Sequence, residues 1–301
     1  MAEPAILVPG GAGQLGSDLA AQGAAAGVDV HTPPSAELDI TRTGAVVRAV
    51  RELATRARAA GRLPVVINAA AYTTVDDAET DERRAFAVNA DGPRVLAAVC
   101  SANRVPLVHV STDYVFSGEA AQPYEPDDLL APRNAYGRTK AAGESAVLGS
   151  GADAWVVRTA WVYGAAGASF VHTMARLERG KDTLSVVDDQ RGSPTWSSDL
   201  AAGLLELAEA IADGRGPAQR TLHCTAAGET TWFGFARAIF SELGADPERV
   251  RPCTTEEFPR PAPRPAYSVL SNATWQEAGL RPLRDWRPAL AEFIARHRAE
   301  I

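Results

Sequence analysis

Short apolar runs alternate with longer amphipathic stretches over the first half of the chain. The apolar runs predict buried strands, at about residues 6–8, 28–31, 64–68, 107–111 and 155–158. The stretches between them have helical spacing of apolar positions and predict helices, at about 15–26, 43–60, 79–102 and 136–148. Such alternation is typical of a parallel sheet with helices on both faces. We therefore expect an α/β fold built on a Rossmann-type, doubly wound parallel sheet.

The pattern becomes less regular after residue 163. Helical spacing returns at 200–213 and 231–244, and the four prolines within Phe258–Pro265 favour an extended path. We expect residues 1–163, plus returning C-terminal segments, to form the sheet domain. Residues 164–301 are expected to form mainly a smaller, irregular lobe that completes a cleft.

The overall composition narrows the kinds of partner. The chain has 301 residues, of which 46% are hydrophobic and 22% charged, an ordinary globular balance. The apolar runs are far shorter than the roughly 20 residues of a membrane span, so we expect no membrane partner. The net charge of −7 disfavours nucleic acid. An anionic small molecule would have to be held by local donors against this overall charge.

The cysteines indicate a cellular compartment and argue against a metal centre. The three cysteines, Cys100, Cys224 and Cys253, are scattered and lack the spacing of metal ligands. An odd number of dispersed cysteines is typical of a reduced cytoplasm, so we expect a cytoplasmic protein with no metal site. The histidines form no cluster either. His109 lies within a predicted strand and is expected to be an interior residue with satisfied hydrogen bonds.

A glycine-rich loop follows the first predicted strand and opens the first helix. It runs Gly10-Gly11-Ala12-Gly13-Gln14-Leu15-Gly16 and contains Gly-x-Gly-x-x-Gly. Glycines without side chains let the backbone approach a pyrophosphate, and the helix N-terminus offers free N–H groups to it. We therefore predict that the sheet domain binds a dinucleotide, with contacts from Gly10, Gly13, Gln14, Leu15 and Gly16.

Further cofactor contacts are expected where the next strands end. The second strand ends in His31 and Thr32, with no acid for a ribose 2′-hydroxyl and no adjoining arginine, so these residues leave both NADPH and NADH open. Asp39 and Ile40 follow soon after and are candidates for the adenine side, although a plain loop explains Asp39 equally well. Small residues after the third strand would permit close approach of the cofactor, and these are Ala69, Ala70 and Ala71.

A hydroxyl and a Tyr/Lys pair complete the candidate catalytic set. Thr112 ends the fourth strand, where a hydroxyl can hydrogen-bond a substrate carbonyl. Tyr136 and Lys140 stand four residues apart and share a helix face. An ammonium near a phenol lowers the phenol pKa, so this pair predicts a proton donor for the reduction of a ketone. The ribose of the cofactor is expected to contact Tyr136 and Lys140 as well.

With these motifs in this order, the chain resembles the extended short-chain dehydrogenase/reductase superfamily. Within it, the chain is similar to the dTDP-4-dehydrorhamnose reductase family over essentially its full length. Besides the glycine loop and the Tyr/Lys pair, the similarity rests on five further strings, which are Asn68 to Thr73, Val88-Asn89-Ala90, Ser111 to Phe116, Arg158 to Tyr163 and Asp189 to Thr195. The third and fifth strings are the most discriminating.

The resemblance implies a reaction and a substrate. NADPH would reduce the C4 ketone of dTDP-4-dehydro-L-rhamnose, with Thr112, Tyr136 and Lys140 as the catalytic residues. Related dehydratases have Asp-Glu after the corresponding threonine, whereas here Asp113 is followed by Tyr114. The second carboxylate for dehydration is therefore missing, which favours reduction.

The resemblance also implies residues that surround the sugar. Asp113, Tyr114 and Trp161 would line its pocket, and Gln190 and Thr195 would lie near it. Some relatives use Mg²⁺, which the residues of this chain leave open, as they leave open a homodimer. Two other functions stay in view. The first is a 4-ketoreductase for another dTDP-4-keto-deoxysugar of secondary metabolism, and the second is a non-catalytic NADP-binding regulatory subunit.

Overall fold

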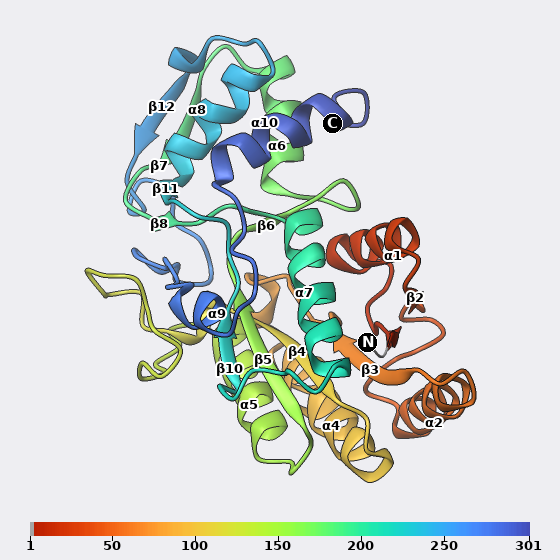
Figure 1. Cartoon of the computed structure of the whole chain (residues 1–301). Coiled ribbons are helices and arrows are strands. Elements are labelled where there is room, and N and C mark those ends of the chain that lie inside the picture. The colour runs from red at the N-terminus through yellow and green to blue at the C-terminus, as the bar shows by residue number, and fades with distance from the viewer. Residues whose placement is uncertain (1–2) are drawn as a thin grey trace.

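The computed structural model describes residues 3–301, and a six-stranded parallel sheet lies at its centre (Figure 1). The strands follow the order β10-β5-β4-β3-β1-β2. Their bounds are β1 Pro4–Leu7, β2 Asp29–His31, β3 Leu63–Asn68, β4 Leu107–Thr112, β5 Ala154–Thr159 and β10 Thr221–His223. The predicted α/β fold with a Rossmann-type parallel sheet is confirmed, and each of the five predicted strands is present.

The alternation of side chains along the strands builds two cores. In β1, Ile6 points into the core beneath α1 (Gln14–Ala26) and α7 (Ser197–Ala212). Its neighbour Leu7 points to the opposite face, into the core beneath α2 (Thr43–Ala59) and α4 (Gly92–Asn103). Successive strand residues point to opposite faces, so continuous apolar runs are the pattern that a sheet covered on both sides requires.

The predicted helix 79–102 is wrong as a single element. The chain forms η1 (Asp77–Glu79), α3 (Glu82–Phe86), a π-helical turn η2 (Ala87–Asp91) and then α4. Pro93 lies in the first turn of α4 and has no N–H to donate to the carbonyl of Asn89, four residues earlier. The regular ladder is therefore broken at this point, and the wider turn places Asn89 where it makes the contacts described below.

Residues after 163 contribute to the sheet and also build a third core, away from the sheet. β10 pairs with β5, and α7 packs against α1. The other elements from this half are β6 Val162–Tyr163, α6 Phe170–Gly180, β7 Leu184–Val187, β8 Arg191–Gly192, β9 Thr195–Trp196, β11 Thr230–Thr231, α8 Trp232–Glu242, η4 Pro247–Arg249, β12 Val250–Cys253, α9 Ala273–Glu277 and α10 Trp286–His297.

The third core gathers aromatic side chains between three helices. α6, α8 and α10 lie together beyond the carboxyl ends of the strands (Figure 1). Phe235 of α8 and Phe293 of α10 are fully buried there against Tyr163. The sequence analysis predicted α7 and α8 but not α6 or α10, whose apolar side chains pack with those of α8 in this core. The division at residue 163 stays a prediction.

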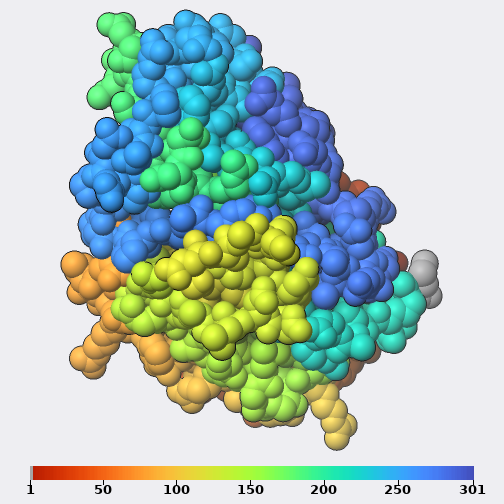
Figure 2. Space-filling view, turned by 90° about the vertical axis from the view of Figure 1, so that its left-hand side faces the viewer, coloured from red at the N-terminus to blue at the C-terminus, as the bar shows by residue number. Residues whose placement is uncertain are grey.

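The segment after β4 lies against a returning C-terminal segment. η3 (Asp113–Val115) is followed by a loop, and this loop lies beside residues near 270 in Figure 2. Tyr124 N–H donates to the Val269 carbonyl at 2.9 Å, and Tyr267 N–H donates to Gly118 at 3.0 Å. The two halves of the chain are therefore joined next to the end of β4. Within residues 3–301, no helix has the length and apolar character needed to cross a membrane.

Candidate active site

The structure brings Thr112, Tyr136 and Lys140 together at the carboxyl edge of the sheet. Thr112 is the last residue of β4, and the other two lie in the first turns of α5 (Ala135–Leu148). All three are buried, with exposed fractions of 7%, 9% and 2%. The Thr112 side chain is near enough to Tyr136 to lower the pKa of its phenol against the effect of burial. The hydroxyl, phenol and ammonium expected from the sequence therefore form one cluster.

Local sequence explains why α5 begins at this place. Asn134 caps the helix, because its side chain accepts a hydrogen bond from Gly137 N–H at 2.8 Å. Glu79 accepts from Ala135 N–H at 2.7 Å, which adds a negative charge at the positive end of the helix dipole. Gly143 permits close packing against η2, since a Cβ there would lie 2.0 Å from the Asn89 carbonyl.

Asn89 positions the catalytic helix, and sequence reasoning gave it no role. Its side chain accepts from Tyr72 N–H at 2.8 Å and donates to the Tyr72 carbonyl at 3.1 Å. It also donates to the Thr139 hydroxyl at 3.0 Å, and Thr139 lies between Tyr136 and Lys140. The signal was present, because Val-Asn-Ala places one amide in an apolar helical stretch. A buried amide of this kind needs partners from other segments.

The expected effect of Lys140 on the Tyr136 pKa is wrong for this structure. Burial raises the pKa of Tyr136 above its usual value, and the Asp113 charge adds to this effect. The Thr112 side chain acts in the opposite direction. Lys140 donates instead to the Val110 carbonyl at 2.7 Å. Tyr136 is therefore a fully protonated phenol at neutral pH, which is the form that can give up a proton.

Lys140 and His109 share a buried polar region beneath the site. Burial lowers the pKa of Lys140 to about 8, and the Glu144 carboxylate opposes this shift. Burial and the Lys140 charge hold the pKa of His109 well below its usual value, so the imidazole is neutral. His109 Nδ1 lies 3.0 Å from the Asn68 amide, but its Nε2 has no partner within the described chain. The prediction of a fully satisfied interior histidine is wrong for this second nitrogen.

Asp113 and Tyr114 continue the cluster beyond Thr112. The Thr112 hydroxyl donates to Asp113 Oδ1 at 2.8 Å, whereas Asp113 Oδ2 has no protein partner among the described residues. Burial raises the pKa of Asp113 to about 6. The Tyr114 ring meets the Tyr136 ring edge to face, with centroids 5.6 Å apart. An unpaired buried carboxylate oxygen beside the phenol is suited to receive a hydroxyl of a bound sugar.

The glycine loop has the form of a pyrophosphate cradle. Gly10 has φ of 86°, and a Cβ there would lie 2.7 Å from Ala70 N. The loop therefore packs directly on the end of β3, where Ala69 N–H donates to the Pro9 carbonyl at 3.1 Å. Gly13 is the N-cap of α1 and offers no side chain to the first N–H groups of the helix. These N–H groups can donate hydrogen bonds to an anion, so this region fits the pyrophosphate of a dinucleotide.

The other predicted cofactor residues are placed in different ways. The Gln14 side chain donates to the Ala168 carbonyl at 2.8 Å, which joins the glycine loop to the later lobe. Leu15 packs against the core beneath α1. The Asp39 carboxylate accepts from Thr41 N–H and its hydroxyl at 2.9 and 2.7 Å. Ile40 is buried in the opposite core, so only its backbone is available to a cofactor. Gly16 lies in the first turn of α1, and Ala71 lies three residues after the end of β3.

Trp161 is held in a strained conformation by two neighbours. Its φ of 48° lies in the left-handed region, which a tryptophan rarely adopts. The ring stacks on Trp232 with centroids 3.5 Å apart and planes at 5°. A Cβ on Gly192 would lie 2.4 Å from Trp161 Cε2, so a glycine is required there. Such strain is found at ligand sites. Trp161 was among the predicted residues, whereas sequence reasoning missed its stacking partner Trp232.

Gln190 and Thr195 make their hydrogen bonds within the protein. Gln190 Nε2 donates to the Thr255 hydroxyl at 2.9 Å. Thr195 Oγ1 donates to the Ser193 carbonyl at 3.1 Å and accepts from Ala226 N–H at 3.2 Å. Thr195 N–H also donates to the Trp161 carbonyl at 3.2 Å. These contacts build the turn around Trp161, and direct contact of Gln190 or Thr195 with a substrate stays a prediction.

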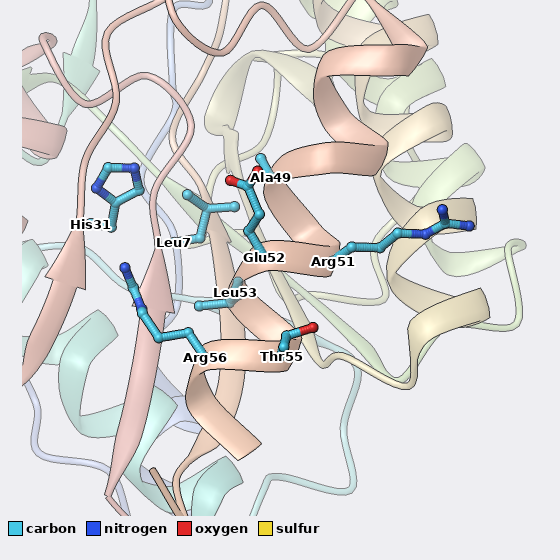
Figure 3. A pocket seen from close by; sticks show the side chains of 8 residues that line it. All are labelled: Leu7, His31, Ala49, Arg51, Glu52, Leu53, Thr55 and Arg56. Atoms are coloured by element: carbon cyan, nitrogen blue, oxygen red, sulfur yellow. The ribbon is translucent and has the colours of Figure 1, made fainter. Parts of the chain in front are cut away.

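Other cavities are separate from this cluster. A pocket of about 460 Å³ lies between β1, β2 and α2, and it is lined by residues that include Leu7, His31 and Arg56 (Figure 3). Arg51 extends away from Leu7 and His31 in this view. None of its lining residues belongs to the catalytic set. Across residues 3–301, no group of three or more His, Cys, Asp or Glu side chains is placed to hold a metal ion.

The fold and the site together define a dinucleotide-dependent reductase of the short-chain dehydrogenase/reductase class. A family model described as "RmlD substrate binding domain" matches residues 4–299. A dTDP-4-dehydrorhamnose reductase of Mycobacterium tuberculosis is 50% identical over 295 residues, covering 96% of this chain and 92% of that protein. The chain belongs to the dTDP-4-dehydrorhamnose reductase family.

Other relatives share the full length of the chain. A probable dTDP-4,6-dihydroxy-2-methyloxan-3-one 4-ketoreductase of Streptomyces antibioticus is 50% identical, covering 95% of this chain and 93% of that protein. A crystal structure of a dTDP-4-dehydrorhamnose reductase from Clostridium acetobutylicum has a TM-score of 0.88 and 41% identity, covering 97% of this chain and 99% of that one. The Bacillus anthracis enzyme in complex with NADP has a TM-score of 0.89 and 34% identity, covering 98% and 100%.

Proposed function

We propose that this chain uses NADPH to reduce the C4 ketone of dTDP-4-dehydro-L-rhamnose, giving dTDP-L-rhamnose. The observation that carries the proposal is that Thr112, Tyr136 and Lys140 lie at the same edge of the sheet as the glycine loop. A protonated phenol, an orienting hydroxyl and a cation are the groups that ketone reduction needs from a protein. The names of the relatives supply the sugar.

NADPH is the favoured cofactor for two reasons. A relative with 34% identity has been crystallised with NADP. In addition, β2 ends in His31 rather than in an acid that would repel a 2′-phosphate. When bound, the cofactor supplies a hydride to the carbonyl carbon. The chain provides the glycine loop for the pyrophosphate and Lys140 for the nicotinamide ribose. Use of NADH and a need for Mg²⁺ are open to direct assay.

The proton reaches oxygen from Tyr136. As hydride arrives at C4, negative charge develops on the oxygen, and the phenol donates its proton there. A sugar alcohol is a weaker acid than an ordinary phenol, which favours this transfer, and the rise in the Tyr136 pKa on burial reduces that advantage. Thr112 orients the carbonyl by a hydrogen bond. General acid catalysis of this kind typically contributes about 10²–10⁴-fold to the rate.

Tyr114 supports reduction over dehydration. It occupies the position where related dehydratases have the second carboxylate of their Asp-Glu pair. Tyr114 is partly buried, and burial raises its pKa, so it stays neutral and cannot act as a base at working pH. Asp113 is then the single carboxylate next to Thr112, and elimination of water from the sugar has no second group to assist it.

The decisive assay mixes the protein with NADPH and dTDP-4-dehydro-L-rhamnose. We expect loss of reduced-nicotinamide absorbance and a product whose C4 configuration, resolved by NMR, is that of dTDP-L-rhamnose. If no dTDP-4-keto-6-deoxysugar is reduced while NADPH binds normally, the chain is a non-catalytic NADP-binding subunit and the proposal is wrong.

A second substrate has specific support. The Streptomyces antibioticus 4-ketoreductase is as similar to this chain as the Mycobacterium tuberculosis enzyme, at 50% identity. The second candidate is therefore a different dTDP-4-keto-deoxysugar of secondary metabolism. A competition assay with both sugars in one mixture, followed by comparison of kcat/KM, decides between them. A homodimer and a cytoplasmic location also stay predictions, which sedimentation and cell fractionation would test.

A further inference from the structure

Lys140 is an ammonium group in an unfavourable place. Its side chain is 2% exposed, and the Val110 carbonyl accepts a hydrogen bond from it at 2.7 Å. A neutral carbonyl compensates only part of the cost of burying a positive charge. The proposed role of Lys140 requires that this charge persist at working pH, so another group must stabilise it.

Glu144 lies one helical turn beyond Lys140 on the same face of α5. It is 1% exposed, and its carboxylate is bound by Arg158 of β5 in a bidentate pair. Arg158 Nη2 donates to Oε2 at 2.8 Å, and Nε donates to Oε1 at 3.0 Å. Charge-assisted hydrogen bonds of this kind compensate part of the cost of burying a carboxylate.

The Arg158 guanidinium is itself fixed from three other sides. Nη1 donates to the Pro126 carbonyl at 2.9 Å and lies 3.3 Å from His223 Nε2 of β10. The guanidinium also lies over the Phe116 ring, 4.9 Å from its centroid. The arginine cannot turn away, so Glu144 is held at one point relative to Lys140. The same arginine joins the catalytic helix to the loop after η3.

We propose that Glu144 is a positioning residue that keeps the Lys140 ammonium charged, and that Arg158 holds the Glu144 carboxylate where it does so. The proposal adds a role for Glu144 and Arg158 to the proposed reductase function and rests on that function for its purpose. The charge of Lys140 can nevertheless be measured without any substrate.

The other titratable groups near Lys140 do not replace Glu144. Tyr136, one turn earlier, is a neutral phenol, and His109 of β4 is a neutral imidazole because burial and Lys140 lower its pKa. Among the neighbouring charges, Glu144 is the one that raises the Lys140 pKa against burial. Arg158 and His223 lie beyond Glu144, and Asp113 lies beyond Tyr136. Loss of the Glu144 charge should therefore move the Lys140 pKa further below about 8.

The small number of lysines in the chain makes the pKa of Lys140 measurable. It has two lysines, Lys140 and Lys181, and Lys181 is exposed. Protein labelled with ¹³C at the lysine ε position therefore gives two NMR signals, and Lys181 is an internal reference. In Glu144→Gln, we expect the Lys140 titration midpoint to fall by about one pH unit or more, since a nearby opposite charge shifts a pKa by about one to three units. Lys181 should not change, and Glu144→Asp should stay nearer the unmodified protein.

Two further measurements keep the test decisive. Glu144→Gln leaves the buried Arg158 guanidinium without its carboxylate partner, so Glu144→Gln with Arg158→Met removes both charges together and avoids this cost. A fall of the Lys140 midpoint is also expected in the double variant, but a smaller one, because the positive charge of Arg158 is removed as well; circular dichroism checks folding. The alkaline limb of kcat should move down by as much as the Lys140 midpoint does in each variant.

The outcomes separate the two proposals. A Lys140 midpoint unchanged in a folded variant overturns the role of Glu144 and leaves the ion pair a purely structural contact. A shifted midpoint in a protein that reduces no keto sugar supports the role of Glu144 and counts against the reductase function alone.

Discussion

Thr112 donates its hydroxyl proton to Asp113 Oδ1 at 2.8 Å, so the group expected to hold a substrate carbonyl is bound by its own neighbour. To donate to a ketone, Thr112 must turn its proton away from Asp113. The Asp113 carboxylate then needs another donor, and a hydroxyl of the sugar can supply one. The pair therefore links recognition of the sugar to orientation of the carbonyl.

Asp113→Asn should change how stability depends on pH. Burial raises the pKa of Asp113 to about 6, so the folded protein binds this proton more tightly than the unfolded chain. That contribution to stability is present below the ordinary pKa of an aspartate and is lost as pH rises through about 6. Asparagine does not titrate. The variant should therefore gain about 2 kcal/mol relative to the unmodified protein between pH 4.5 and 7.5.

Urea unfolding at both pH values measures this difference. Asp182→Asn changes an exposed carboxyl and is the matched control. Equal behaviour of the two variants would show that the Asp113 carboxyl is not perturbed.

Tyr136→Phe should lower kcat by about 10²–10⁴-fold, because the proton donor is removed while the ring remains. NADPH affinity, measured by fluorescence titration, should change little. Tyr163→Phe is the matched control, since the Tyr163 hydroxyl is buried without a protein partner among the described residues. Near-normal turnover in Tyr136→Phe would rule out the assignment of the proton donor.

Asn89→Ala should weaken both the fold and the catalytic helix. The change leaves the Tyr72 N–H and carbonyl without their buried partner and removes the donor to Thr139. We expect a loss of about 2–4 kcal/mol in the free energy of unfolding, since each unsatisfied buried group costs about 1–3 kcal/mol. Urea denaturation measures the loss, and kcat should fall with it.

Asn103→Ala is the control for this variant. The Asn103 side chain donates one hydrogen bond to the Val99 carbonyl near the end of α4. We expect a loss of about 1 kcal/mol or less for a single bond of this kind. A similar loss of unfolding free energy in both variants would mean that the three Asn89 hydrogen bonds stabilise the fold no more than the single Asn103 bond.

Gly192→Ala should disturb the sugar pocket through Trp161. The added Cβ would lie 2.4 Å from Trp161 Cε2, so the ring must move off its stack with Trp232. We expect a change in tryptophan fluorescence and a rise of about tenfold in KM for the keto sugar, which corresponds to about 1.4 kcal/mol of binding. Gly44→Ala is the control, because its Cβ would meet no atom closer than 3.9 Å. An unchanged KM would show that Trp161 does not contact the sugar.

Much of the fold and of the catalytic cluster follows from local pattern. Apolar runs specify buried strands because each strand is covered on both faces, and the parallel order places their carboxyl ends along one edge. The positions of Gly10, Thr112, Tyr136 and Lys140 could therefore be predicted from strand ends and helix spacing alone. Prediction was poorer for α6 and α10, which the sequence analysis did not assign. Their apolar side chains pack with those of α8 in the core of the later lobe.

The tertiary structure decided the electrostatics and the contacts between distant segments. Four-residue spacing indicated that Lys140 lies near Tyr136, but burial raises the phenol pKa and Lys140 donates to the Val110 carbonyl instead. The Asn89 amide and the Arg158–Glu144 pair join segments far apart in the chain, so no local pattern reveals them. The sequence by itself thus determined which chemical groups meet at the sheet edge. Their ionisation and orientation depend on desolvation and on partners that only folding brings together.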